Sequence, residues 1–316
     1  MNKLCSKNKL TPTKKSIALA LKHYGIFDFD FKPITKGIAN TTIYIHSKNK
    51  KFVLRFYAQH RKADEDILFE LNFQDYLHKN GIPIPKIYQN INGSQLTFLV
   101  VDRKKWQVVL MEFISGTSKT KHTYELIKEL STLQARMHIL GAEFPRSLKK
   151  ENKSWKKLED YYALYIKDTH EYPSTVRDFV ARAKNFTHPL NQKLPFGYNH
   201  LDLDLDGNVI VKNNRIRGIV DFDDLSYSPI SACLGYSLWN VLHDENIENM
   251  KEYLKYYESI RPLEKSERLT LPEIILFRNY EIGALRLYKT GDPSVLKRPL
   301  EIEKEINMQL LNFFHV

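Results

Sequence analysis

Two patterns of hydrophobic and polar residues divide the chain. In the first 113 residues, apolar residues alternate with polar ones or form short runs, which favours β-strands. One longer stretch, Asp64–Lys79, repeats its apolar residues at helical spacing and ends at Asn80-Gly81, a typical helix stop. The expected strands are Phe27–Pro33, Thr41–His46, Lys51–Tyr57, Gln95–Val101 and Trp106–Phe113. This section therefore predicts a β-sheet with one helix between its third and fourth strands.

Helical spacing dominates the rest of the chain. The expected helices are Thr123–Leu140, Ser154–Lys167, Ser174–Asn185, Ile230–Leu242, Asn246–Ile260, Pro272–Tyr288 and Pro299–Phe314. The segment Phe144–Lys153, with Pro145 and several charges, is expected to be a flexible loop. Together the two patterns predict an α+β protein.

One β-hairpin interrupts the helical part. Residues 209–220 contain two apolar runs joined by Asn213-Asn214, a pair typical of a two-residue turn. Such a turn brings Asn208 and Asp221, which lie thirteen residues apart, to the same open end of the hairpin. Amide and carboxylate oxygens are ligands that suit Mg²⁺, especially when a phosphate supplies further oxygens. The hairpin therefore predicts a metal site at its open end.

Two further polar residues, His200 and Asp202, stand just before this hairpin, where a general base would lie. The ordered set His200-x-Asp202, Asn208 and Asp221–Asp223 resembles the catalytic loop and metal loop of the aminoglycoside phosphotransferase and choline kinase-like superfamily. That superfamily is a small-molecule branch of the protein-kinase fold. The order of these residues, with the hairpin between them, is far more specific than any one of them alone.

This resemblance implies a fold and a reaction. The fold would be bilobal, with a small antiparallel β-sheet lobe for the nucleotide (residues 1–113) and a larger, mainly helical catalytic and substrate-binding lobe (residues 114–316). The reaction would be transfer of the γ-phosphate of Mg-ATP to a hydroxyl of a small molecule. Asp202 would orient the acceptor hydroxyl and His200 would brace the loop. Asn208 and Asp221 would hold Mg²⁺.

The catalytic loop departs from the family in one respect. The family places five steps between its catalytic Asp and its metal Asn, whereas Asp202 lies six steps and Asp204 four steps before Asn208. A one-residue bulge would restore the geometry with Asp202 in place, and Asp202 is preferred because it follows His200 as expected. If the loop cannot adjust, the alternative is a nucleotide-binding pseudokinase or sensor with little transfer activity.

The first section also resembles the nucleotide side of these kinases. The loop Ile34–Thr42, with Gly37, stands where the family covers the phosphates, although such a sequence is also typical of a plain turn between strands. Arg55 occupies the third-strand position of the phosphate-binding cation, and Glu70 on the following helix would be its ion-pair partner. Arg can bind phosphate through two parallel hydrogen bonds, which Lys cannot.

The stretch Val108–Gly116 resembles the hinge that binds adenine through its backbone. By the family pattern, the carbonyl group of Glu112 and the N–H group of Ile114 would face the base. A buried strand that ends at Ser115-Gly116 would give the same sequence pattern, and the two interpretations are compatible.

The acceptor is the least determined part. Asp223, Asp224 and Tyr227, together with Glu281 on a later helix, are candidates to line its pocket, although the aromatic residues from Tyr227 onward also fit a helix core. The C-terminal section is only mildly acidic, which does not suit a polycation. We therefore expect a small amino alcohol or hydroxy amino acid, such as choline, ethanolamine or homoserine, ahead of an aminoglycoside-like acceptor.

Composition bounds the remaining possibilities. The net charge is +11, with the basic excess in the first 224 residues, so a nucleic-acid-associated protein is a less favoured alternative. The chain has only two cysteines, which fits a reducing cytoplasm better than a disulfide framework. No apolar run approaches the ~20 residues that a membrane helix needs, and the N-terminus does not resemble a signal peptide. These features predict a cytoplasmic enzyme without a membrane partner; they leave its oligomeric state open.

Overall fold

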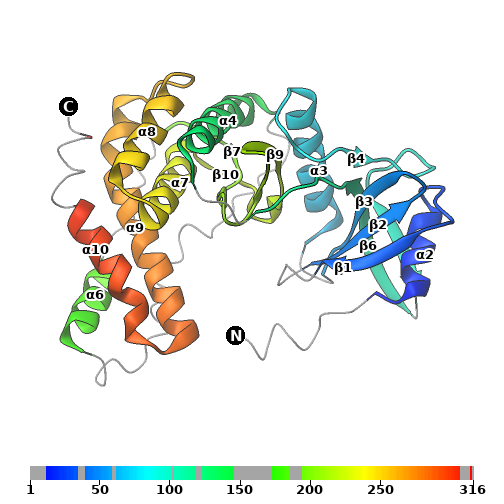
Figure 1. The fold of residues 1–316 in the computed structure, drawn as a ribbon, viewed down its shortest axis with the longest axis horizontal. Coiled ribbons are helices and arrows are strands. Elements are labelled where there is room, and N and C mark those ends of the chain that lie inside the picture. The colour runs from blue at the N-terminus through cyan, green and yellow to red at the C-terminus, as the bar shows by residue number, and fades with distance from the viewer. Residues whose placement is uncertain are drawn as a thin grey trace. The chain divides into compact units, whose positions relative to one another are not determined.

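A computed structural model describes residues 12–34, 40–58, 62–101, 103–118, 122–145, 173–185, 194–306 and 314 (Figure 1). The chain forms two compact units. The first unit comprises residues 1–116 with 217–220, and the second comprises residues 117–216 with 221–316.

The first unit is built on one antiparallel sheet. Its strands are β1 (Asp30–Ile34), β2 (Thr41–Ser47), β3 (Lys50–Phe56), β4 (Ile87–Tyr88), β5 (Thr97–Val101) and β6 (Lys104–Glu112). They follow the order β1-β2-β3-β6-β4, and β5 also pairs with β6. Figure 1 shows two helices beside this sheet, α2 (Lys14–Lys22) and α3 (Asp64–Lys79).

Strand alternation explains why both faces of this sheet carry a helix. On β6, Val108 and Leu110 belong to the cluster that includes Ile17 of α2, whereas the intervening Val109 packs in the cluster of Ile67 on α3. Successive side chains of a strand point to opposite faces, so one buried strand serves two cores. Because this strand is buried on both faces, its residues 108–111 are all apolar rather than alternating with polar ones.

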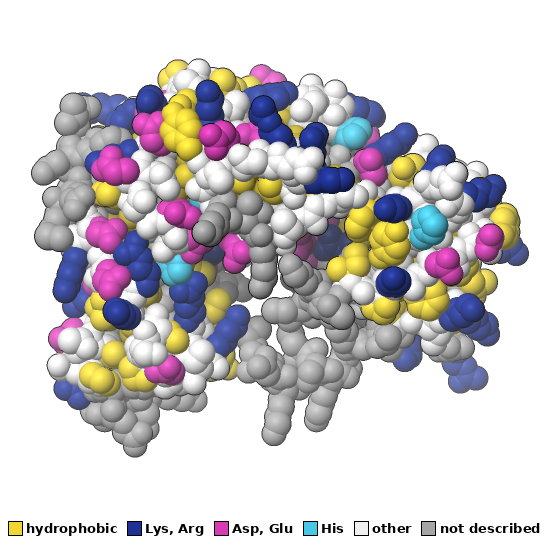
Figure 2. Space-filling view, viewed as in Figure 1, with side chains coloured by type: hydrophobic (Ala, Val, Ile, Leu, Met, Phe, Trp, Pro, Cys, Tyr) yellow, Lys and Arg dark blue, Asp and Glu magenta, His cyan; other side chains and the backbone are white. Residues whose placement is uncertain are grey.

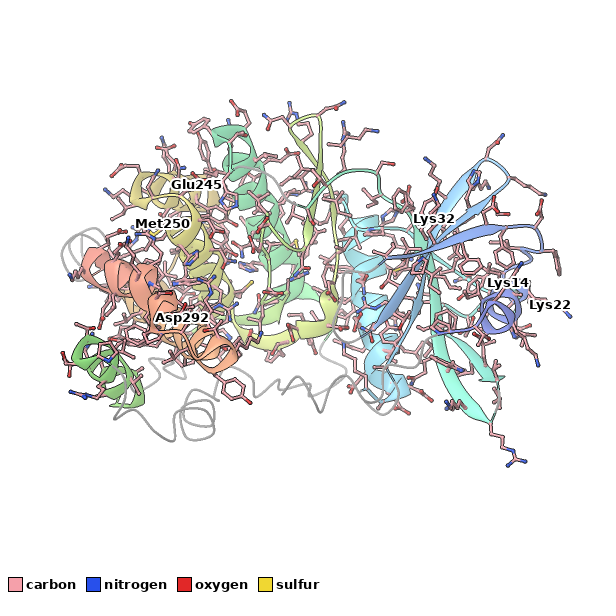
Figure 3. All side chains as sticks on the ribbon, turned by 60° about the horizontal axis from the view of Figure 1, so that its bottom comes forward. Lys14, Lys22, Lys32, Glu245, Met250 and Asp292 are labelled. Atoms are coloured by element: carbon pink, nitrogen blue, oxygen red, sulfur yellow. The ribbon has the colours of Figure 1, made fainter. Side chains whose placement is uncertain are left out.

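Helix α2 was not predicted from the sequence. Thr13 caps it by accepting the N–H of Ser16 at 3.2 Å, and Lys22 lies in its last turn. Figure 3 labels Lys14 and Lys22 at its two ends. Ile17 and Leu21 of this helix are buried against the sheet. The many lysines nearby in the sequence obscured this apolar pattern.

The second unit is mainly helical. Its helices are α4 (Tyr124–Glu143), α6 (Ser174–Asn185), α7 (Ile230–Asp244), α8 (Ile247–Glu258), α9 (Lys265–Thr290) and α10 (Lys297–Glu305). Two short 3₁₀ helices, η3 (Phe222–Asp224) and η4 (Pro293–Leu296), accompany them. Every residue of α7 from Ile230 to Leu242 is buried, so this helix forms the centre of the unit, and α9 and α8 pack against it.

Two small sheets position the polar segment predicted to hold the site. Strand β7 (Phe196–Asn199) pairs antiparallel with β10 (Ser226–Pro229), and β8 (Val209–Lys212) pairs with β9 (Arg215–Ile219). Asn213 and Asn214 both have positive φ, 54° and 53°, as a two-residue hairpin turn of the mirror-image type requires. The predicted hairpin is therefore present with its predicted turn.

Several predicted boundaries change. Helices α3 and α6 have the predicted limits, but α9 begins at Lys265 and contains Pro272 in its interior, so the predicted start at Pro272 is wrong. The helix begins earlier because Glu264 and Glu267 form a reciprocal capping box. Proline is most common at the first turn of a helix, which is why it was mistaken for the start. The predicted helix Ser154–Lys167 lies outside the described residues.

Surface charge and hydropathy are unexceptional. On the face drawn in Figure 2, Lys and Arg side chains of the described residues are interspersed with acidic and neutral ones rather than gathered in one continuous patch. Among the helices in the described ranges, none combines the length and the apolar character needed to span a membrane.

Candidate active site

The catalytic loop starts where β7 ends, and His200 anchors it. The His200 side chain is buried, and its ring lies edge-on to Phe222 with 4.6 Å between centroids. Its Nδ1 accepts the backbone N–H of Asp202 at 3.3 Å. Between them Leu201 adopts φ +58°, a left-handed conformation that is uncommon for a branched residue. This geometry fits the predicted bracing role of His200.

Asp202 and Asn208 meet despite their longer spacing. The Asn208 side-chain Nδ2 donates to the Asp202 backbone carbonyl at 2.8 Å and to the Asp202 carboxylate at 2.9 Å. Because the amide nitrogen makes these bonds, the amide oxygen of Asn208 is the atom available to a cation. The Asp202 side chain remains 47% exposed and so is accessible to an acceptor.

A tight turn takes up the extra residue of this loop. The Asp204 carbonyl accepts the N–H groups of Asn208 at 3.0 Å and Val209 at 3.1 Å, and the Asp204 carboxylate accepts the N–H of Asp206 at 3.0 Å. Residues 204–208 thus form a single helical turn that is not continued. It provides the local adjustment that the six-step spacing requires.

The metal loop follows the hairpin. Asn208 directly precedes β8, and Asp221 follows β9 by two residues, so both lie at the hairpin's open end. Asp221 has φ 66° and ψ 65°, a left-handed conformation that Asp tolerates better than most residues. The chain then turns directly into η3, which carries Asp223 and Asp224.

Carboxylates concentrate negative charge here. Burial raises the pKa of Asp224 above its usual value, and the nearby carboxylates of Asp202, Asp223 and Asp221 raise it further. A divalent cation would relieve this repulsion. The available donors, the amide oxygen of Asn208 and the carboxylate of Asp221, are hard oxygen ligands that fit Mg²⁺.

Sequence reasoning missed one residue, Arg278 of α9. Its Nη1 donates to Glu281 at 2.7 Å, and its Nη2 lies 3.8 Å from the Asp202 carboxylate. The guanidinium lies over the ring of Tyr236 at 4.5 Å and near that of Trp239 at 6.0 Å. Its Nε is buried without a hydrogen-bond partner among the described residues. The spacing of Arg278 and Glu281, three apart on one helix, was the available signal.

The other predicted acceptor residues have different surroundings. Glu281 lies beside Arg278, as described, and Asp223 and Asp224 belong to η3. Tyr227 packs in the β7–β10 sheet, with its ring 5.6 Å from Phe196 and 5.1 Å from Tyr198. Its ring contacts fit the core interpretation of this residue.

In the first unit, Glu70 binds partners that the sequence did not indicate. It is fully buried and accepts Lys62 Nζ at 2.5 Å, with Tyr57 and Gln74 each at 3.3 Å. Arg55 lies over the Tyr57 ring at 5.1 Å. The predicted Arg55–Glu70 ion pair stays a prediction.

The remaining nucleotide-side predictions concern the backbone. Glu112 ends β6, and its backbone N–H donates to the Lys86 carbonyl at 2.8 Å. Ile114 follows the strand, and its side chain packs against Gly218, where an added Cβ would come within 2.5 Å of Ile114 Cδ1. Gly37 lies outside the described residues.

Comparison with known proteins shows which family this chain belongs to. A model of the phosphotransferase enzyme family matches residues 30–269. The chain belongs to this family. A homoserine kinase of Mesorhizobium japonicum is 27% identical to it over 275 residues, which cover 85% of this chain and 83% of that enzyme.

Two solved structures have a fold similar to that of this chain. An amicoumacin kinase in complex with AMP-PNP, Ca²⁺ and Ami has a TM-score of 0.73 at 20% identity, covering 97% of this chain and 96% of its own. A microcompartment-associated aminopropanol kinase has a TM-score of 0.72 at 18% identity, covering 93% of this chain and 95% of its own.

These findings confirm the predicted family, the α+β protein-kinase-like fold and the class of reaction, ATP-dependent phosphorylation of a small-molecule hydroxyl. The predicted nucleotide and metal cofactors agree with the AMP-PNP and Ca²⁺ of the amicoumacin kinase complex, and Mg²⁺ stays a prediction for this chain. The roles of individual site residues stay predictions.

Proposed function

We propose that this enzyme phosphorylates the side-chain hydroxyl of a small hydroxy amino acid of the homoserine type, with Mg-ATP as donor. The proposal rests on the position of the Arg278 guanidinium. It lies 3.8 Å from the Asp202 carboxylate and donates a hydrogen bond to Glu281. A cation next to the catalytic carboxylate suits an acceptor that bears its own negative charge.

The charges of this cluster match a zwitterion. An amino acid would place its carboxylate on Arg278, which can bind it through two parallel hydrogen bonds, and its ammonium near Glu281. Its side-chain hydroxyl would then reach Asp202. An amino alcohol has no carboxylate, so it could not use the hydrogen bonds of Arg278, and its ammonium would gain only from the acidic side chains nearby. The relatives named homoserine kinase support the same choice.

The mechanism follows from these positions. Asp202 would accept the hydroxyl proton as the acceptor oxygen attacks the γ-phosphorus, and the bond from that phosphorus to the departing ADP oxygen would break. Asn208 and Asp221 would hold Mg²⁺, which supplies charge neutralisation on the phosphates. Most of the acceleration would come from positioning and electrostatics.

The first unit would supply the nucleotide contacts. We propose that Arg55 holds the α- and β-phosphates, with Glu70 orienting it. The carbonyl group of Glu112 and the N–H group of Ile114 would bind adenine. These roles rest on the family resemblance and on the placement of Arg55 on β3, Glu70 on α3 and Glu112 at the end of β6.

The test compares two acceptors that differ only in the carboxylate, homoserine and 3-aminopropan-1-ol. The wild type should prefer homoserine. Arg278→Gln should raise the KM for homoserine about 10- to 100-fold, the value of one lost charged hydrogen bond, and should spare or improve the amino alcohol. The matched control is Arg268→Gln, which changes an Arg on the same helix that pairs with Glu258.

Two outcomes would reject the proposal. One is a wild-type enzyme that uses 3-aminopropan-1-ol as well as homoserine. The other is an Arg278→Gln variant with unchanged preference and unchanged ATP binding. ATP binding without transfer to any hydroxyl acceptor would favour the pseudokinase alternative.

A further inference from the structure

Three residues from distant parts of the second unit converge beside the catalytic loop. One ring nitrogen of His122 and one carboxylate oxygen each of Asp204 and Asp244 all lie within 4.8 Å of one another. His122 precedes the cap of α4, Asp204 starts the catalytic-loop turn, and Asp244 ends α7. Figure 3 labels the neighbouring Glu245 at that end of α7. Neither the sequence pattern nor the phosphotransfer chemistry accounts for this triad.

The histidine is the first sign of a ligand. His122 is only 8% exposed, and its Nδ1 is buried without a hydrogen-bond partner among the described residues. Burying an unsatisfied polar nitrogen costs free energy, so such an atom calls for a ligand. A neutral imidazole nitrogen next to two carboxylates is a typical set of metal donors.

Hydrogen bonds hold the carboxylates of Asp204 and Asp244 in place. One oxygen of Asp204 accepts the backbone N–H of Asp206 at 3.0 Å. One oxygen of Asp244 accepts from His243 Nδ1 at 2.5 Å, and His243 Nε2 accepts in turn from Arg286 at 2.7 Å. Hydrogen bonds therefore orient both carboxylates, as they usually orient metal-binding side chains.

Electrostatics also favour a cation here. One carboxylate oxygen of Asp204 and one of Asp244 lie within 4.8 Å of each other. Both acids therefore repel each other in their charged forms. A divalent ion bound by the three side chains would remove this repulsion.

We propose that His122, Asp204 and Asp244 form a second metal site that takes a divalent transition metal of the Zn²⁺ or Mn²⁺ type. An imidazole ligand distinguishes it from the oxygen-only pair Asn208 and Asp221 and favours a transition metal over Mg²⁺. The bound ion fastens the lengthened catalytic loop to the C-terminal end of α7 and to the residue before the cap of α4. The site is independent of the acceptor proposed above.

The experiment uses the untagged full-length protein, stripped with a chelator and free of nucleotide. Zn²⁺ alone and Co²⁺ alone are titrated, with metal content measured after desalting and Co²⁺ coordination followed by visible absorption. We expect one bound equivalent and a rise in Tm. Asp244→Asn and His122→Asn should each weaken binding about 10- to 100-fold or more and abolish the Co²⁺ bands.

The matched control is Asp221→Asn, which alters the proposed catalytic metal ligand and should retain the Zn²⁺ equivalent. The metal-free Tm of each variant reports folding separately from binding. A wild type that retains no Zn²⁺ or Co²⁺, an Asp244→Asn variant that binds as tightly as the wild type, or loss of binding in Asp221→Asn would each overturn the proposal.

Discussion

Asp202 and Asp204 lie two residues apart in one loop but have different surroundings. The Asp202 carboxylate accepts a hydrogen bond from the Asn208 side chain, lies 3.8 Å from Arg278 and is accessible to solvent. Asp204 instead anchors the following turn and lies near His122 and Asp244. These surroundings favour Asp202 over Asp204 as the carboxylate that meets the acceptor.

This separation gives a prediction for two variants. Asp202→Asn should lower kcat by about 10²- to 10⁴-fold, the usual contribution of a positioned general base. Asp204→Asn should lower it far less, because its side chain acts on loop geometry. Both are measured by ADP release at saturating substrates. Equal losses, or a greater loss for Asp204→Asn, would move the base to Asp204.

A buried histidine makes stability depend on pH. His138 is fully enclosed, and its Nδ1 lies 2.7 Å from the hydroxyl of Tyr257. Burial lowers its pKa from 6.5 to about 3, and the positive charge of Arg261 contributes. The folded protein therefore keeps this ring neutral over the range in which the unfolded chain takes up a proton.

The sign of the effect follows directly. Because the folded pKa is depressed, this contribution to stability is fully present above pH 6.5 and is lost as the pH falls toward 3. The free energy of unfolding should fall by at most about 1.4 kcal/mol per pH unit for this group. Urea unfolding of the wild type and of His138→Asn from pH 7.5 to 4.5 measures it. A variant with the same pH slope would contradict the assignment.

At the scale of elements, close backbone contact fixes α4 against β7. A Cβ added to Gly141 of α4 would lie 2.2 Å from the Tyr198 carbonyl oxygen, and one added to Gly197 of β7 would lie 3.0 Å from the Ala142 nitrogen. Two glycines facing each other let the helix approach the strand that leads into the catalytic loop.

Gly141→Ala should therefore destabilise the fold. Alanine gains roughly 1 kcal/mol of helix propensity, but the clash is with backbone, and overpacking of this kind costs about 1–3 kcal/mol or more. Thr132→Ala, at a half-buried position of the same helix where the side chain donates to the Lys128 carbonyl, is the control. Thermal unfolding should show a lower Tm for Gly141→Ala only. A raised Tm would mean that α4 can move away from β7 without penalty.

Elements with local signals were predictable and those fixed by tertiary contacts were not. Helix α3 carries its own stop signal, and the hairpin around Asn213 and Asn214 carries its own turn, so both were found. Strand β4, two residues long, and strands β7 and β10, four residues each, are too short to show a pattern. In the site, the order His200, Asp202, Asn208 and Asp221 is legible along the chain. The spacing of Arg278 and Glu281 could indicate a pair on one helix, but the approach of Arg278 to Asp202 depends on how α9 packs, which local sequence does not show.

At the scale of the whole molecule, ligand binding should stabilise the fold. A ligand that binds only the folded state adds about 2.7 kcal/mol when present at 100 times its Kd. Mg-ATP should therefore raise the Tm of the wild type more than ATP with chelator does. Asp221→Ala should remove the part that depends on Mg²⁺. Differential scanning calorimetry measures both, and an undiminished Mg²⁺ effect in the variant would reject Asp221 as a ligand.

Helix α9 has a consequence for how this enzyme could acquire new acceptors. It runs for 26 residues from a capping box at Glu264 to Gly291, and Arg278 stands near its middle. If Arg278 selects the acceptor as proposed, exchanging loops, which is how many enzymes diverge, would not change it. A single change of charge at position 278 should then alter the acceptor. Directed evolution toward amino alcohols should therefore find its first productive step on this helix.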